Sequence, residues 1–289
     1  MYKGIEFAGR GEKDSWIRDL TEEGIESNPG PIFISKNIDG LNDPKKREKL
    51  FLTIISENRK DKIGAIFLQE HNWHEKVTRI AIKQASTYRL LLVAASVPSA
   101  QTKGGTAIII PFDSIELEKG ETIHDAVTRI RNSASRTACG RVTSLTTKIN
   151  SRQIRLTAAY AHSDAQADQR PGFFTNTLKP RLTQNTVLGI DANCVPDEQL
   201  DLKRIGVHPY NNTGANELAD AISHNALIDV AREYLGRDPF FTSHHNVPGG
   251  TTHTRIDQIY APDINGLVWK HKGDMHDPFP SERTRELDH

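Results

Sequence analysis

Short apolar runs separated by polar turns recur along the chain from residue 31 onward. The run at 63–68 is continuously apolar, which is typical of a strand buried on both faces, and 187–191 has the same character. Two further runs flank the turn pair Asn150-Ser151, which predicts a hairpin. The segments that we predict as strands are 32–35, 63–68, 88–94, 105–111, 142–149, 153–160 and 187–191, with paired strands within 240–260 around Pro248-Gly249-Gly250.

Helical spacing occurs between several of these runs. Leu50, Ile54 and Ile55 share one face of a helix predicted at 44–56, whose first residues, PKKREK, are expected on the solvent side. Pro171 interrupts another helical pattern. The other helices are predicted at 16–23, 170–182 and 217–225.

Strands in pairs with helices between them indicate an α+β fold. We expect two mixed sheets packed face to face with helices outside. Residues 1–30 are polar and charged, whereas no linker-like break follows between 31 and 270. The sequence therefore predicts an N-terminal segment at 1–30 and one domain at 31–289.

The composition excludes two classes of protein. With 37 basic and 37 acidic residues, the chain is neither a histone-like basic binder nor an acidic disordered tail. A local basic face is still allowed, so a nucleic-acid substrate is neither implied nor excluded. Cys139 and Cys194 are far apart and match no metal-ligand spacing. We expect a reducing, intracellular compartment, because a secreted protein more often carries disulfides. The apolar runs are too short to span a membrane, so no membrane partner is expected.

Acidic side chains gather at the ends of predicted strands. Carboxylates and amides brought to one edge by strand ends form an oxygen-rich site that suits Mg²⁺ or Mn²⁺ rather than zinc. A histidine beside a carboxylate can move protons near neutral pH, so the set suits phosphoryl transfer. The residues concerned are Glu70, Asp191, Asn193, Asp257, Asp288 and His289. Taken singly, Glu70 could be solvated, Asp191 and Asn193 could form an Asx-turn, and Asp257 could be a surface ion pair.

Six motifs in order resemble those of the endonuclease/exonuclease/phosphatase superfamily, which includes exonuclease-III-like repair enzymes and LINE-type retrotransposon endonucleases. The resemblance covers about residues 31–289 and implies a four-layered, exonuclease-III/DNase-I-like sandwich. The motifs are Asn37-Ile38-Asp39-Gly40-Leu41, Gln69-Glu70, Ala159-Tyr160-Ala161, Ile190-Asp191-Ala192-Asn193, Thr254-Arg255-Ile256-Asp257 and Leu287-Asp288-His289.

The resemblance implies a role for each matching position. Glu70 would be the main ligand of Mg²⁺ or Mn²⁺, and the further metal residues would be Asn37, Asp288 and Asp39. The catalytic residues would be Asp191, Asn193, Asp257, His289 and Tyr160, and the substrate-binding residues would be Arg255, Thr254 and Ser163. Asp191 would orient or deprotonate the attacking water, Asn193 and Tyr160 would contact the phosphate, and Asp257 would steady His289. Whether Asp191 or His289 is the base stays open.

Three positions depart from the family's pattern. Ile190 replaces a glycine, although Gly189 precedes it, His162-Ser163 replaces Pro-Asn, and Leu287 replaces a serine. None of these changes removes a catalytic group, so we expect activity.

Three features resemble the retrotransposon branch. Asn42 to Arg47 continues the first motif as in LINE endonucleases, although PKKREK is also read as the solvent face of a helix or as a nuclear signal. Residues 241–254 resemble the hairpin by which such nucleases choose their DNA target. We interpret His244, His245 and His253 as exposed loop histidines rather than a metal site. Family members have another strand after the last motif, so the chain resembles a piece of a longer polyprotein.

This resemblance implies a Mg²⁺-dependent DNA endonuclease that nicks one strand and leaves a 3′-hydroxyl for a reverse transcriptase domain of the same polyprotein. It also implies a location in the nucleus and cytoplasm. The alternatives are an apurinic/apyrimidinic repair endonuclease, an inositol-phosphate or lipid phosphatase, and a non-catalytic binding relative.

The stretch from Gly24 to Pro31, GIESNPGP, resembles a 2A-like ribosome-skipping peptide of pattern D-(V/I)-E-x-N-P-G-P. The break would fall between Gly30 and Pro31, while Gly24 departs from the pattern's aspartate. The alternative is a turn that opens the domain, in which Pro29 and Pro31 restrict the backbone.

Overall fold

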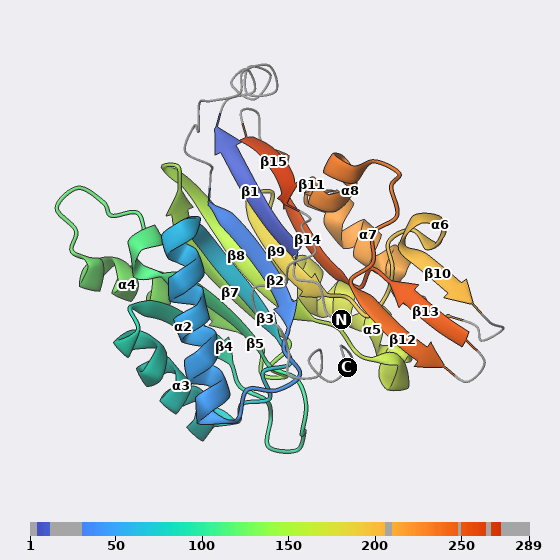
Figure 1. The fold of residues 1–289 in the computed structure, drawn as a ribbon, viewed down its shortest axis with the longest axis horizontal. Helices are drawn as coiled ribbons and strands as arrows, with labels where there is room; N and C mark the ends of the chain where they lie inside the picture. The colour runs from blue at the N-terminus through green and yellow to red at the C-terminus, as the bar shows by residue number, and fades with distance from the viewer. Residues whose placement is uncertain (1–4, 12–30, 206–209, 248–249, 264–266, 273–289) are drawn as a thin grey trace.

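The computed structural model describes residues 5–11, 31–205, 210–247, 250–263 and 267–272 of the chain. Its described elements form two six-stranded sheets, with a three-stranded sheet projecting at one end (Figure 1). Four predictions fall outside the described residues: the helix at 16–23, the GIESNPG part of the 2A-like motif, Asp288 and His289.

The first sheet has the strand order β15-β1-β2-β3-β5-β4. Its central pair, β2 and β3, is parallel, and the other neighbours are antiparallel. Every residue of β3 is buried, as its continuous apolar run predicts. The bounds are β1 Ile5–Gly11, β2 Ile32–Asn37, β3 Ile63–Gln69, β4 Leu90–Ala95, β5 Thr106–Pro111 and β15 Leu267–Lys272.

The second sheet has the strand order β11-β14-β9-β8-β7-β6 and contains a parallel pair, β8 and β9. The predicted hairpin is β7 and β8, and Asn150 and Ser151 adopt positive φ values of 50° and 61° at its turn. The bounds are β6 Ser135–Arg136, β7 Val142–Ile149, β8 Arg152–Tyr160, β9 Thr186–Asp191, β11 Leu227–Asp229 and β14 Asp257–Pro262.

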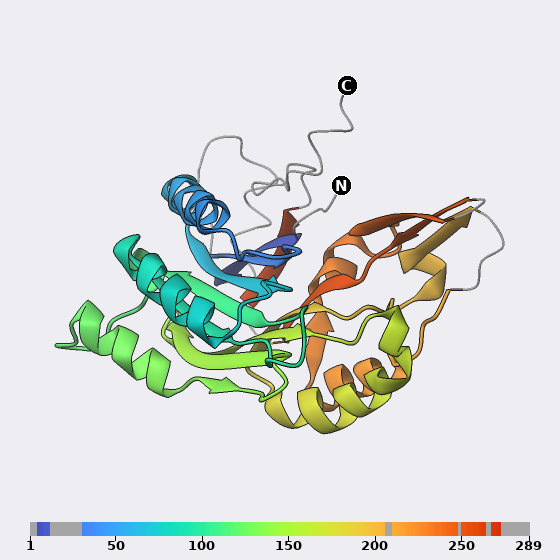
Figure 2. The ribbon, with the colours of Figure 1, turned by 90° about the horizontal axis from the view of Figure 1, so that it is seen from below.

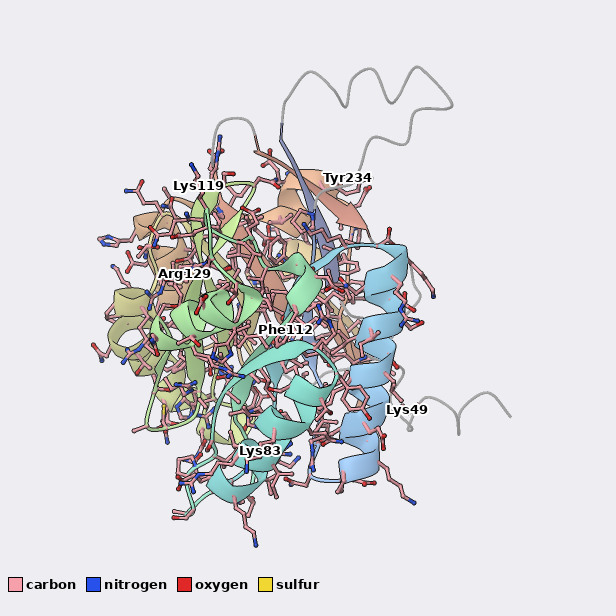
Figure 3. All side chains as sticks on the ribbon, turned by 90° about the vertical axis from the view of Figure 1, so that its left-hand side faces the viewer. Lys49, Lys83, Phe112, Lys119, Arg129 and Tyr234 are labelled. Atoms are coloured by element: carbon pink, nitrogen blue, oxygen red, sulfur yellow. The ribbon has the colours of Figure 1, made fainter. Side chains whose placement is uncertain are left out.

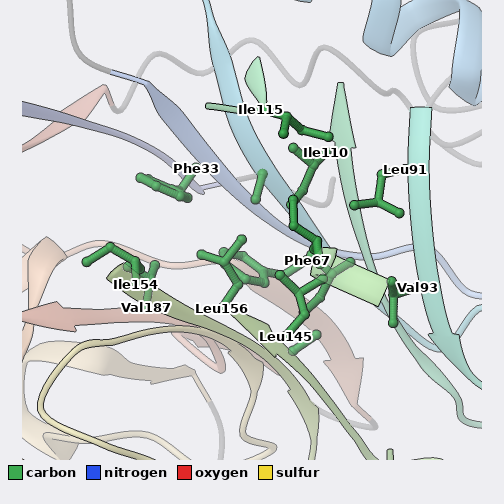
Figure 4. Packing of buried hydrophobic residues seen from close by; sticks show 14 of the residues in the cluster. Phe33, Phe67, Leu91, Val93, Ile110, Ile115, Leu145, Ile154, Leu156 and Val187 are labelled. Atoms are coloured by element: carbon green, nitrogen blue, oxygen red, sulfur yellow. The ribbon is translucent and has the colours of Figure 1, made fainter. Parts of the chain in front are cut away.

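The two sheets pack face to face over a core of aliphatic and aromatic side chains (Figure 4). Phe33 of β2 and Phe67 of β3 stack with centroids 6.4 Å apart and meet Leu145, Leu156 and Val187 of the second sheet. Helices α2 (Pro44–Lys60) and α3 (Glu75–Thr87) cover the outer face of the first sheet, and α7 (Ala215–His224) covers that of the second (Figure 2). The predicted four-layered α+β sandwich is confirmed.

Helix α2 begins where the sequence indicates and runs four residues beyond the predicted end. Asp43 caps it by accepting a hydrogen bond from the backbone N–H of Lys45, 2.9 Å away, and Pro44 occupies the first turn. Lys49 on this helix and Lys83 on α3 are exposed on the outer surface (Figure 3). Arg47 is instead buried, so the PKKREK stretch is only partly a solvent face.

The predicted helix at 170–182 is divided into three short pieces. They are α5 Arg170–Gly172, a π-helical turn η3 Phe173–Leu178, and a 3₁₀ turn η4 Lys179–Arg181. Pro171 and Pro180 each lie in the first turn of a piece, where a missing N–H costs least. The remaining elements are η1 Phe112–Ser114, α4 Ile123–Asn132, η2 Asp164–Gln169, α6 Glu198–Asp201 and α8 Val230–Leu235.

Residues 5–11 form strand β1, which lies between β15 and β2 in the first sheet. The described sheet therefore includes part of the segment that we assigned to 1–30. The domain boundary near Pro31 stays a prediction.

The projecting three-stranded sheet, called the arm below, has the order β10-β13-β12 (Figures 1 and 2). Its strands are β10 Leu202–Ile205, β12 Ser243–Val247 and β13 Gly250–Thr254. The pairing of β12 with β13 confirms the paired strands predicted around Pro248-Gly249-Gly250, whereas β10 was not predicted.

Candidate active site

The two parallel strand pairs end at the same edge of the sandwich. In the first sheet Asn37 pairs with Gln69, immediately before Glu70, and in the second sheet Tyr160 pairs with Asp191. Each sheet thus delivers two polar side chains from the carboxyl ends of its parallel strands.

These four side chains form one hydrogen-bonded network between the sheets. The Asn37 amide nitrogen donates to Glu70 Oε1 at 3.0 Å and to Asp191 Oδ2 at 2.8 Å. The Tyr160 hydroxyl donates to the same Glu70 oxygen at 2.6 Å. The structure therefore brings together two predicted metal residues and two predicted catalytic residues from strands far apart in sequence.

Asp191 is buried at the centre of this network. Burial raises the pKa of its carboxyl to about 7, and the charge of Glu70 adds to the rise while the Asn37 hydrogen bond opposes it. The backbone N–H of Asn193 donates to Asp191 Oδ1 at 3.1 Å, and Asn193 has a positive φ of 49°. The Asx-turn that we considered as an alternative is thus present at this catalytic candidate.

Tyr160 remains a hydrogen-bond donor over the whole range of working pH. Burial and the charges of Asp191 and Glu70 raise the pKa of its hydroxyl above the usual value. The Arg141 guanidinium lies 5.2 Å from the ring centroid and donates to the backbone oxygens of Tyr160 and Ala161. Arg141 belongs to none of the six motifs, so no sequence pattern predicted it at this site.

Asp257 on β14 is the neighbour of Asp191 in the second sheet. It pairs with Asp191 across β14 and β9 and is 4% exposed, so the interpretation as a surface ion pair is wrong. Burial raises the pKa of the Asp257 carboxyl well above its usual range, and the nearby charge of Asp191 adds to this rise. Its Oδ1 atom is buried without a hydrogen-bond partner among the described residues.

Glu70 and Asn193 hold unusual backbone conformations for residues with side chains. Glu70 has a φ of 55°, in the left-handed region that is uncommon outside glycine. Beneath it, Gln69 donates to Ser35 Oγ at 3.1 Å and to the Gly189 oxygen at 3.4 Å, so this buried amide ties the two sheets together. Such strain is tolerated where surrounding contacts fix the chain, as they do here.

Two further predicted residues lie at the exposed rim. Asp39 is exposed, its carboxylate is 3.5 Å from Lys103 Nζ, and its backbone N–H donates to Asn37 Oδ1 at 3.1 Å. Ser163 is exposed at the residue preceding η2. Asp39 therefore supports the orientation of Asn37 through its backbone.

The structure contradicts substrate binding by Arg255. Its side chain is fully buried, and its guanidinium makes ion pairs with Asp201 at 2.7 Å and Asp229 at 2.6 Å. All of its donors point into this cluster rather than to the surface. Thr254 is 1% exposed, and its backbone oxygen accepts from Thr242 N. We therefore assign Arg255 a structural role.

The candidate loop histidines His244 and His253 lie on strands instead. They face each other in the register of β12 and β13, with ring centroids 4.5 Å apart and a hydrogen bond between their Nδ1 atoms. His244 is exposed and His253 is half-buried. No group of three or more His, Cys, Asp or Glu side chains among the described residues is placed to hold a metal ion by itself.

The donors in the network match a hard divalent cation better than zinc. Glu70 is half-buried, and it offers a carboxylate beside the Asn37 amide and the Asp191 carboxylate. Mg²⁺ usually binds proteins through one or two carboxylates and keeps several waters, so it does not require a larger cluster of side chains. Zinc sites need three or four nitrogen, sulfur or carboxylate ligands, which the described part of the chain does not gather here.

Comparison with solved structures identifies the fold. An AP endonuclease from Leishmania major superposes with a TM-score of 0.56 at 13% identity, covering 80% of this chain and 78% of that one. A 3′-5′ exonuclease, NExo, from Neisseria meningitidis gives 0.51 at 16% identity, covering 80% and 86%. This chain has the fold of AP endonucleases.

The endonuclease domain of the telomere-specific non-LTR retrotransposon TRAS1 superposes on this AP-endonuclease fold with a lower TM-score, 0.44, at 10% identity, covering 80% and 84% of the two chains. No family model and no curated protein matches the sequence. In the part of the chain that the structure describes, no helix is both long enough and apolar enough to cross a membrane.

Proposed function

We propose that this chain is a Mg²⁺-dependent DNA endonuclease that hydrolyses one phosphodiester bond of a duplex and leaves a 3′-hydroxyl. The observation that carries the proposal is the network in which Asn37, Glu70, Tyr160 and Asp191 meet between the two sheets. The motif resemblance and the AP-endonuclease fold both support it.

Glu70 and Asn37, with Asp288 and the backbone support of Asp39, would hold Mg²⁺, and Mn²⁺ would serve as a substitute. When bound, the cation neutralises charge on the scissile phosphate. The charge of Glu70 contributes to the raised pKa values of Asp191 and Asp257, so a cation at this edge would favour the ionised form of both carboxyls.

Asp191 is suited to accept the proton of the attacking water, because a carboxyl pKa of about 7 makes it a stronger base than an exposed aspartate. The water oxygen forms a bond to phosphorus as the bond from phosphorus to the 3′-oxygen breaks, and the 3′-oxygen takes up a proton. The Tyr160 hydroxyl, which donates to Glu70 in the structure, would exchange that bond for one to the phosphate or the leaving oxygen. The Asn193 amide would donate to the same group with the N–H that does not bond Ala161. His289, steadied by Asp257, would bind the same phosphate.

The experiment that tests this activity uses a labelled duplex and reads the ends of the product. We expect wild-type protein with Mg²⁺ to produce nicks that a DNA polymerase extends directly, because the product carries a 3′-hydroxyl. His289→Ala should reduce the rate without changing the product ends. Nicks that the polymerase cannot extend would contradict the proposed direction of cleavage.

A repair endonuclease is the second candidate, and the likeness of the fold to AP endonucleases favours it. A duplex with one abasic site, compared with the same duplex intact, separates the two. A large preference for the abasic duplex supports repair, whereas comparable cleavage of both supports the retrotransposon role. Release of inorganic phosphate from an inositol phosphate would favour the phosphatase.

We further propose that the nuclease acts in a non-LTR retrotransposon, where a reverse transcriptase domain of the same polyprotein extends the nick, in the nucleus and cytoplasm. The motif order and the hairpin formed by β12 and β13 support this assignment. The 2A-like reading of Gly24 to Pro31 belongs to the same proposal. A translation reporter with residues 1–31 between two proteins should yield two separate products, and a single fusion product contradicts the break between Gly30 and Pro31.

A further inference from the structure

The arm is rooted in a buried polar cluster. Its three strands meet the body at Asp201, Thr242 and Thr254, which are each at most 1% exposed. The Thr242 N–H donates to the Thr254 oxygen at 2.8 Å, and the Arg255 N–H donates to the Asp201 oxygen at 3.0 Å. These bonds join all three strand ends at one place.

Arg255 makes two bidentate pairs of hydrogen bonds, or forks, at this root. Its Nε and Nη2 donate to the two oxygens of Asp201 at 2.7 and 3.0 Å, and its Nη1 and Nη2 donate to the two oxygens of Asp229 at 3.1 and 2.6 Å. Arg232 donates to Asp201 Oδ1 at 2.8 Å, so two arginines balance two aspartates. We call Asp201, Asp229, Arg232 and Arg255 the arm lock.

The arm lock is better suited to fixing geometry than to adding stability. Buried ion pairs gain little over apolar packing because both charges lose their water, but paired forks accept only a narrow range of orientations. Asp201 ends α6 beside β10, Asp229 precedes α8, and Arg255 follows β13. The arm lock therefore sets the angle between the arm and the second sheet.

A single hydroxyl connects this root to the candidate active site. Thr242 Oγ1 accepts hydrogen bonds from the backbone N–H groups of Ile256 and Asp257 at 3.2 and 3.0 Å. Asp257 in turn pairs with Asp191 across β14 and β9. Hydrogen bonds and strand pairing thus connect the base of the arm to the carboxylates that would act on the phosphate.

The arm also differs from the rest of the chain in charge. The strands β10, β12 and β13 contain no aspartate or glutamate, while β10 carries two exposed basic residues, Lys203 and Arg204, one toward each face of the strand. The whole chain, by contrast, has equal numbers of acidic and basic residues. A positively charged projection beside a carboxylate-rich site is suited to contact the phosphates that flank the cleaved bond.

We propose that the arm lock positions the arm relative to the Glu70–Asp191 network and thereby selects which phosphodiester bond is cut. Arg255 is a positioning residue in this scheme: it touches no substrate and acts through the orientation of the arm. The proposal rests on the proposed endonuclease function and adds the buried residues that orient the arm.

The test is Arg255→Lys, which keeps the charge but cannot form paired forks. On an end-labelled duplex, nicks that wild type concentrates at preferred bonds should spread to neighbouring bonds. The KM should rise about tenfold, the equivalent of roughly one lost hydrogen bond, with kcat within about threefold of wild type. A purely structural effect would instead lower the amount of active enzyme, and so the apparent kcat, without moving the nicks or the KM.

The matched control is Arg129→Lys, because Arg129 on α4 makes the same kind of paired hydrogen bonds to Glu121, outside the arm and its root. This control should leave nick positions unchanged. Asp229→Asn is the second test variant, for use if Arg255→Lys does not fold, since it weakens one fork and keeps the other. If every folded arm-lock variant has the same nick positions and the same KM as wild type, the proposal is overturned.

Hydrogen exchange provides a readout that does not depend on cleavage. In the arm-lock variants, the backbone amides of β12 and β13 should exchange faster than in wild type, because only the root of the arm is loosened. The amides of β7 and β8 should exchange at the wild-type rate. If wild type fails to nick any DNA, the endonuclease function is contradicted, while faster exchange confined to the arm still supports the positioning role. Unchanged exchange in the arm counts against the arm lock itself.

Discussion

Asp191 combines a raised carboxyl pKa with a fixed orientation of its carboxyl group. It is buried, and burial with the nearby charge of Glu70 raises the pKa of the Asp191 carboxyl to about 7. It also accepts hydrogen bonds from Asn37 and the Asn193 backbone, which hold its two oxygens in fixed directions. A strong base in a fixed position is what proton removal from water requires.

This pKa predicts how the cleavage rate depends on pH. Asp191 must be ionised to accept a proton, so the rate should rise as the pH increases toward 7 and then level off. A cation bound at Glu70 stabilises the carboxylate, which places the rise at or below pH 7. Initial rates of nicking between pH 5 and 8.5 measure this, and a rate that falls steadily over that range contradicts Asp191 as the base.

The same pKa predicts that Asp191→Asn is inactive but more stable. The folded-state pKa of about 7 lies above the usual aspartate value of 3.8, so the ionised carboxylate destabilises the fold once the pH exceeds about 4. In EDTA at pH 8 we expect the variant to gain about 1 kcal/mol or more in its free energy of unfolding, and to gain little at pH 4. Urea unfolding at both pH values measures this, and equal gains at both would contradict the cause.

The two cysteines should react at very different rates. Cys194 is fully buried, and burial raises the pKa of its thiol to about 12, whereas Cys139 is partly exposed. Native protein should therefore react quickly with one equivalent of Ellman's reagent and release the second only in denaturant. Cys139→Ser should remove the fast phase, and two fast equivalents in the native wild type would contradict the burial of Cys194.

At the scale of single residues, the sequence predicts site residues that lie within motifs. It misses contacts between residues that only folding brings together. Glu70, Tyr160 and Asp191 were predicted from their motifs, and the structure joins them in one hydrogen-bonded network through Asn37. Arg255 was assigned wrongly, because its partners Asp201 and Asp229 lie 54 and 26 residues away and no local pattern joins them. Asp288 and His289 remain predictions.

At the scale of elements, β9 depends on a glycine where it packs against β3 of the other sheet. A Cβ added at Gly189 would lie 2.5 Å from the Phe67 ring of β3, well inside van der Waals contact. The neighbouring Ile190 packs on the opposite, helix-covered face of the sheet. In the family pattern a small residue directly precedes the aspartate. Here the small residue is Gly189, one position earlier, and it lies on the face toward the other sheet.

Gly189→Ala should therefore destabilise the protein by about 2 kcal/mol or more, because the Phe67 ring has no room to withdraw. Gly172→Ala is the matched control, since a Cβ there meets only Asn176 at 3.9 Å and should be neutral or stabilising. Urea denaturation measures both changes. Equal stability of the two variants would contradict the close approach of β3 and β9.

Element prediction succeeded where apolar runs are long and failed where tertiary contacts decide. The strands of both central pairs and the hairpin at Asn150 were predicted within one or two residues. Helix α4 was missed, although Thr122 and Asp125 form a capping box at its start, and α3 was missed between two buried strands. His244 and His253 were placed in a loop because polar residues at both positions conceal strand pairing.

At the scale of the whole molecule, the sandwich explains why residues separated by up to 154 positions share one site. Alternating strands and helices were enough to predict two packed sheets, because apolar periodicity reports which faces are buried. Strand order is a non-local property, so neither the arm nor the entry of β1 into the first sheet was foreseen. The proposed function depends on the edge where both parallel pairs end.

The central claim is that this edge cuts DNA, and conversion of supercoiled plasmid to open circle with Mg²⁺ tests it most directly. Wild type should nick, EDTA should stop the reaction, and Glu70→Gln should slow it by about 100-fold or more. The control Glu57→Gln changes a glutamate paired with Lys60 on the outer helix α2 and should nick like wild type. Equal nicking by wild type and Glu70→Gln would contradict the account.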